Sequence, residues 1–135
     1  MKRIPQSMAL AAAIVVGIVV VWAANHFGLW WVTALVGVAI GVAFRGTLKI
    51  LGVASLVAVA AWGLDLAFQS LSQPLGAAAT TVAGIMGFGQ VGAIVVALAL
   101  VFAWLLGAAG AWVGAAARRA VHTFGRWSAP LTSRA

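Results

Sequence analysis

Four apolar stretches of near-membrane length constrain this chain more than any other feature of its sequence. They cover about residues 8–25, 29–44, 48–68 and 91–117. A helix needs about 20 apolar residues, at roughly 1.5 Å each, to cross a hydrocarbon core about 30 Å thick. A transmembrane barrel would need strands in which apolar and polar residues alternate, and the stretches show no such alternation. The pattern predicts an all-α integral membrane protein: a single transmembrane domain over 1–135, with four transmembrane helices in a bundle.

The composition excludes a soluble globular protein. Of 135 residues, 65% are hydrophobic and 7% are charged, whereas a soluble domain has about half apolar and a quarter charged residues. So few charges cannot cover a surface in contact with water. The chain also has no cysteine, which excludes disulfides, thiolate metal sites and cysteine nucleophiles.

The basic residues indicate the orientation of the chain. All eight flank the apolar stretches on one predicted side of the membrane: Lys2, Arg3, Arg45, Lys49, Arg118, Arg119, Arg126 and Arg134. The opposite connections, around His26 and over 69–90, contain none. The positive-inside rule therefore predicts a bacterial-type inner membrane protein with both termini in the cytoplasm and a basic cytoplasmic tail over 118–135. We interpret the bases as topology anchors and lipid-headgroup contacts, so the net charge of +7 does not indicate nucleic-acid binding.

The segment between the third and fourth stretches, 69–92, has no charged residue. Pro74 suits the first turn of a helix, and Ser72 could cap it. The segment is predicted to be an outer loop with a short interfacial helix, or else a re-entrant element; lipid does not tolerate exposed irregular backbone, which favours the helix. Its Gly87–Gly92 run matches G-x-G-x-x-G, but no acidic residue follows it, so it does not indicate dinucleotide binding.

Two small-xxx-small patterns lie inside the apolar stretches. One is Gly37 to Gly41, extended by Ala34, and the other is Gly110 to Gly114, extended by Gly107. Small residues let helices approach closely in lipid, where packing drives association. These residues are therefore predicted helix-packing positions, either within this chain or against another subunit.

Asp65 is the only acidic residue and lies near the outer end of the third stretch. Acidic residues inside membranes are candidates for function, but Asp65 lies one turn from Gln69 and is expected to reach interfacial water. A hydrogen bond to His26 or to a partner, and a proton or cation role, are the alternatives. His26 is also a candidate ligand for a pigment or haem held by another subunit. His26 and His122 are predicted on opposite sides of the membrane and cannot share a metal.

The tryptophans gather near the two predicted membrane boundaries. Trp22, Trp30, Trp31 and Trp62 are expected at the outer boundary, and Trp112 and Trp127 at the inner one. This distribution is typical of the aromatic belts of membrane proteins.

These features predict a non-catalytic accessory or scaffolding subunit that packs through Gly/Ala helix faces against other integral membrane subunits. Transport and redox catalysis in a bilayer generally need ionisable or metal-binding groups, and the stretches offer little besides Asp65. We expect no cofactor of its own, contacts with lipid or with a pigment held by neighbours, and no enzyme activity outside a larger membrane enzyme or electron-transfer complex. One alternative is a small homo-oligomeric channel or transporter, with Asp65 near the outer mouth and 84–92 as a flexible gate. Another is a membrane-perturbing protein such as a holin.

Overall fold

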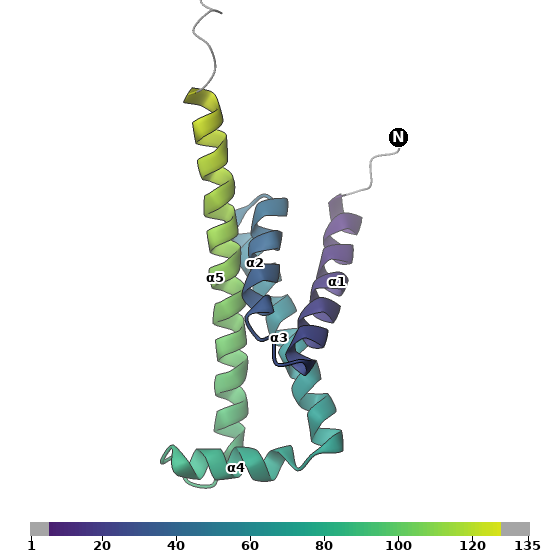
Figure 1. Cartoon of the computed structure of the whole chain (residues 1–135), viewed down its shortest axis with the longest axis vertical. Helices are drawn as coiled ribbons and strands as arrows, with labels where there is room; N and C mark the ends of the chain where they lie inside the picture. Colours follow the sequence, from purple (N-terminus) through teal and green to yellow (C-terminus); the bar gives the residue numbers. More distant parts are fainter. Residues whose placement is uncertain (1–5, 128–135) are drawn as a thin grey trace, which may run out of the picture.

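The computed structural model describes the backbone of residues 6–127 and, within that range, all side chains except those of residues 6, 122 and 124–127. The described part consists of helices joined by short turns (Figure 1). These are α1 (Gln6–His26), α2 (Val32–Ala43), α3 (Thr47–Ser72), α4 (Leu75–Ile85) and α5 (Gly92–Trp127). The predicted all-α class is confirmed.

Three of these helices are long and apolar enough to cross a membrane, which indicates membrane association. The apolar segments are Ser7–His26 in α1, Thr47–Ser72 in α3 and Gly92–Val121 in α5. α2 has 12 residues, about 18 Å, and falls short of a core of about 30 Å. α2 is shorter than the predicted second stretch, 29–44, at both ends. At the start, the carbonyl oxygen of Leu29 accepts a 3.1 Å turn hydrogen bond from Val32 N–H, and at the end the backbone of Phe44 is extended.

α5 is the longest helix, and both α2 and α3 pack along it (Figure 1). α1 packs mainly on α3. α1 begins and α5 ends at the same end of the bundle, while α4 lies across the opposite end, against α5 (Figure 1).

The core is built from small side chains. Among its buried apolar residues are Ala54, Ala58, Ala61, Ala103, Ala111 and Ala115. Ile40, Ile50 and Val57 are buried with them, but many other large apolar side chains point outward; Leu48 and Leu71 are each 87% exposed. Small residues inside and large ones outside are expected when helices associate by close packing in an apolar solvent.

The connection between α4 and α5 contains two glycines in the left-handed region, Gly87 at φ 81° and Gly89 at φ 66°. L residues rarely adopt such backbone angles, so glycine is needed for the chain to reverse there. Turn geometry therefore accounts for these glycines.

Candidate functional site

The closest helix–helix contact joins α2 to α5. A Cβ atom on Gly37 would lie 2.7 Å from the carbonyl oxygen of Gly107, and one on Gly41 would overlap the carbonyl oxygen of Ala111. On the α5 side, Gly110 meets Ala34 in the same way. Only glycine fits at these positions without separating the two backbones.

α5 also packs closely on α3. A Cβ atom on Gly107 would lie 2.6 Å from the carbonyl oxygen of Ala54, and Ser55 Oγ donates a 3.4 Å hydrogen bond to the carbonyl oxygen of Trp104. Gly114 meets Val38 of α2. The predicted packing residues therefore face other helices of this same chain, which leaves their faces covered and unable to contact another subunit.

Asp65 does not reach water as expected, because its side chain is 7% exposed. Its Oδ2 accepts a 2.8 Å hydrogen bond from Gln69 Nε2, one turn further along α3. Its Oδ1 is buried and has no hydrogen-bond partner among the described residues. α3 continues past Asp65 to Ser72, so Gln69 is helical and folds back over the carboxylate. A hydropathy pattern does not show this burial.

The end of α1 lies beside Asp65's end of α3. The rings of Trp22 and His26 lie 6.1 Å and 6.5 Å from that of Phe68. Asn25, next to His26, has an Oδ1 atom that is buried and without a partner in the described part of the chain. The two neighbouring helix segments therefore each carry a buried oxygen that accepts no hydrogen bond from the described residues. Nothing in the sequence pattern singled out Asn25.

His26 is exposed and takes part in an aromatic group with Trp22, whose ring lies 6.3 Å away, and Phe27, at 5.9 Å. It makes no hydrogen bond to Asp65 within the described residues. Over the described side chains, no group of three His, Cys, Asp or Glu residues could hold a metal ion. The prediction of a pigment or haem held by a neighbour stays a prediction.

Arg118 has a specific partner inside the molecule. Its Nη1 donates a 2.9 Å hydrogen bond to the carbonyl oxygen of Gly41 and lies 3.5 Å from that of Val42. These carbonyls belong to the last turn of α2, where a helix lacks internal donors and its dipole attracts cations. Sequence reasoning treated Arg118 only as a headgroup contact, because the two residues that meet are 77 positions apart.

The other predicted headgroup residues fall into two sets. Arg45, Lys49 and Arg119 are exposed. Lys2, Arg3 and the side chain of Arg126 lie outside the described residues, as does the side chain of Trp127.

Comparison of the chain with protein-family models, with curated proteins and with solved structures found no match.

Proposed function

We propose that the protein crosses a bacterial-type inner membrane four times, through α1, α2, α3 and α5, with both termini in the cytoplasm. The positions of the basic residues support this topology. Arg45 and Lys49 follow α2 and line a hollow together with Ser7, near the start of α1. Arg118 bonds to the last turn of α2. The connection between α2 and α3 lies at the end of the bundle where α1 begins (Figure 1). α4 would then lie in the outer interface.

The short α2 is compatible with this topology. The turn before it contains Trp30 and Trp31, which are 51% and 48% exposed. Tryptophan anchors a helix end at the headgroup level, and a bilayer accommodates a short helix by thinning locally, at fractions of a kcal/mol per ångström.

Within this topology we propose that the protein is a non-catalytic accessory or scaffolding subunit of a larger membrane complex. The observation that carries the proposal is the length of α5. Its 36 residues extend about 54 Å, and its last turns continue beyond the bundle (Figure 1). Beyond Arg118, which bonds to the last turn of α2, residues 119–121 are exposed, and Val121 is 71% exposed. A helical segment without packing is marginally stable in water, so contact with another subunit would stabilise this one.

The partner surface differs from the one expected from sequence. The Gly/Ala faces of α2 and α5 are used within the chain, so a partner would contact the outward side of α5 and its projecting end. Trp104 and Trp112 on that side are 51% and 60% exposed. Large exposed aromatic side chains are typical anchors of subunit interfaces.

Native purification in a mild detergent, followed by mass spectrometry of the intact assembly, tests the proposal. We expect larger, cofactor-bearing subunits to co-purify with the protein. Val121→Ser, on the projecting end, should reduce that recovery. Ile85→Ser is the matched control, because Ile85 is 82% exposed but belongs to α4 at the opposite end. Purification as a self-contained oligomer would contradict the subunit proposal.

A small homo-oligomeric channel or transporter is the second candidate. It is favoured by the buried Oδ1 atoms of Asp65 and Asn25, neither of which has a partner among the described residues. A cation, a proton or a water molecule would satisfy such oxygens. Ion flux through liposomes that contain only this protein would support this candidate.

A further inference from the structure

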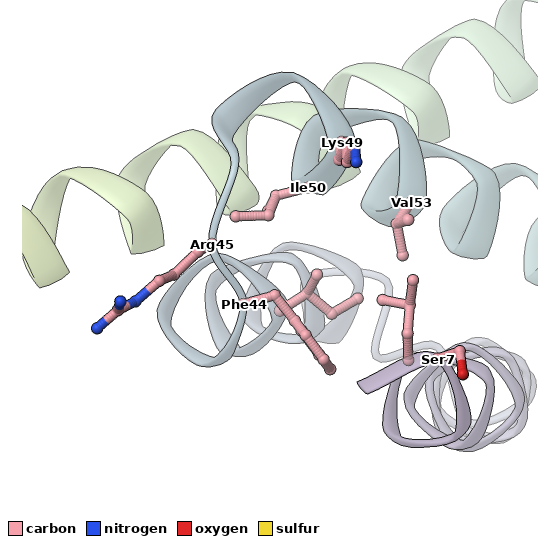
Figure 2. Close-up of a pocket in the computed structure, with 8 residues that line it drawn as sticks. Ser7, Phe44, Arg45, Lys49, Ile50 and Val53 are labelled. Atoms are coloured by element: carbon pink, nitrogen blue, oxygen red, sulfur yellow. The ribbon is translucent and has the colours of Figure 1, made fainter. Parts of the chain in front are cut away.

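A hollow of about 270 Å³ opens at the end of the bundle where α1 begins (Figure 2). Most of its lining is apolar and includes Ile40, Ile50 and Val53, with Ser7 of α1 as the one uncharged polar residue. Arg45 and Lys49 also line it, and Figure 2 shows Arg45 extending outward from the connection between α2 and α3. The hollow therefore combines an apolar interior with a basic edge.

A second hollow, of about 250 Å³, continues from the first between α1 and α2. The two share Ile40 and Phe44, so they adjoin, and we call them together the α1–α2 groove. The second hollow is lined entirely by apolar residues, including Ala13 and Val16 of α1 and Ala39 of α2. In Figure 1, α1 diverges from α2 toward this end.

The groove is shorter than the hydrocarbon thickness of one membrane leaflet. Its wall on α2 extends from Val36 to Ala43, which is about 10 Å along a helix. Half of a hydrocarbon core is about 15 Å. A hydrocarbon chain that enters beside Phe44 would therefore run along the groove toward the middle of the membrane.

The mouth of the groove is positively charged. Both basic side chains are exposed, and the only acidic residue of the chain, Asp65, lies 16 residues from Lys49 on the same helix, about 24 Å away. No described side chain caps the N-terminus of α3, which begins at Thr47 between the two bases. A helix N-terminus carries partial positive charge and adds to the attraction for an anion.

We propose that the α1–α2 groove binds an anionic phospholipid, with an acyl chain between α1 and α2 and the phosphate at Arg45 and Lys49. A soluble anion would leave the apolar groove empty, and an uncharged lipid would leave the two bases without a partner. An anionic amphiphile satisfies both. The binding site is independent of whether the protein is a subunit of a complex.

Lipid binding can be measured on the purified full chain in detergent by native mass spectrometry, with phosphatidylglycerol and phosphatidylcholine as probes. We expect preferential retention of phosphatidylglycerol. Lys49→Gln should weaken that retention roughly fivefold, and Arg45→Gln with Lys49→Gln roughly thirty-fold. Arg119→Gln removes another exposed base, outside the groove, and should change retention less than twofold. Equal losses in Lys49→Gln and Arg119→Gln would mean general charge attraction and would overturn the proposal.

The position of the acyl chain in the α1–α2 groove needs a separate test. Ala39→Leu narrows the groove and keeps both bases, so it should reduce phosphatidylglycerol retention several-fold. Ala109→Leu is the control, because Ala109 is exposed on α5. Glycerol phosphate, which has the anion without the chain, should not raise the unfolding temperature as phosphatidylglycerol does. Unchanged retention in Ala39→Leu, or equal protection by glycerol phosphate, would overturn the proposal.

Discussion

Trp62 Nε1 donates a 3.0 Å hydrogen bond to Oγ1 of Thr33, which joins α3 to the first turns of α2. Thr33 is 2% exposed, so its hydroxyl has no access to solvent. The ring of Trp62 also lies 6.1 Å from that of Phe102 on α5. Because this hydrogen bond is a directional contact between two otherwise apolar helices, it fixes how α2 and α3 are aligned along one another.

Thr33→Val and Trp62→Phe should each lower the free energy of unfolding, since either change removes the hydrogen bond. Thr33→Val also leaves the indole N–H unpaired, a penalty of about 1 kcal/mol or more. Interhelical hydrogen bonds in membranes contribute about 0.6 kcal/mol on average. A double-mutant cycle measured by denaturant unfolding in detergent should give a coupling energy of about that size. Strictly additive effects would mean that the bond contributes nothing.

Gly41→Ala should destabilise the protein, because the new methyl group would overlap the carbonyl oxygen of Ala111. We expect a loss of about 1–3 kcal/mol, as for other overpacked contacts. Gly52→Ala is the matched control, since a Cβ atom there meets no described atom within 4 Å. The control should leave stability unchanged or raise it by up to about 1 kcal/mol through helix propensity. The measurement is the thermal unfolding of both variants. Equal unfolding midpoints would contradict the close contact between α2 and α5.

Arg118→Gln should lower stability by about 1 kcal/mol, because the carbonyl oxygen of Gly41 loses its charged donor. Arg119→Gln makes the same charge change on an exposed neighbour and should have little effect. Unfolding temperatures of both variants, measured at low and high salt, distinguish the loss of this hydrogen bond from the loss of a surface charge. If both variants behave alike, Arg118 acts only as a surface charge.

Asp65→Asn should leave assembly intact and keep or raise the unfolding temperature. The change removes a buried carboxylate and keeps an oxygen that can accept the Gln69 hydrogen bond. Asp65→Leu should be less stable, because the Gln69 amide loses its acceptor. Flux assays in liposomes are the second measurement. Flux in the native protein that is lost in the folded Asn variant would favour the channel or transporter over the accessory subunit.

The topology can be tested by cysteine labelling, because the chain has no cysteine of its own. Phe27→Cys and Ser72→Cys should react with an impermeant maleimide added outside the cell. Leu48→Cys should react only after lysis; Leu48 is 87% exposed and lies next to Lys49 at the opposite end. Protection of both outer positions, or labelling of Leu48→Cys in intact cells, would overturn the four-span arrangement.

The apolar stretches were enough to predict the long helices α1, α3 and α5 to within a few residues at most ends. A chain with so few polar side chains must satisfy its backbone hydrogen bonds internally, and an uninterrupted apolar run can do so only as a helix. Two boundaries were beyond this argument. Trp30 and Trp31 lie within the second apolar stretch but belong to a turn. α5 continues through Arg118 and Arg119 because alanine and arginine are strong helix formers.

The sequence by itself determined the helical class and the small-residue faces, since both depend on the identity of residues close together in the chain. The tertiary structure decided what those faces and side chains contact. It paired the Gly41 face with α5, brought Arg118 to the end of α2, and buried Asp65 under Gln69. These outcomes depend on how helices distant in the chain lie against one another, and in an apolar environment that arrangement is set by close packing and a few directional hydrogen bonds, for which hydropathy carries no signal.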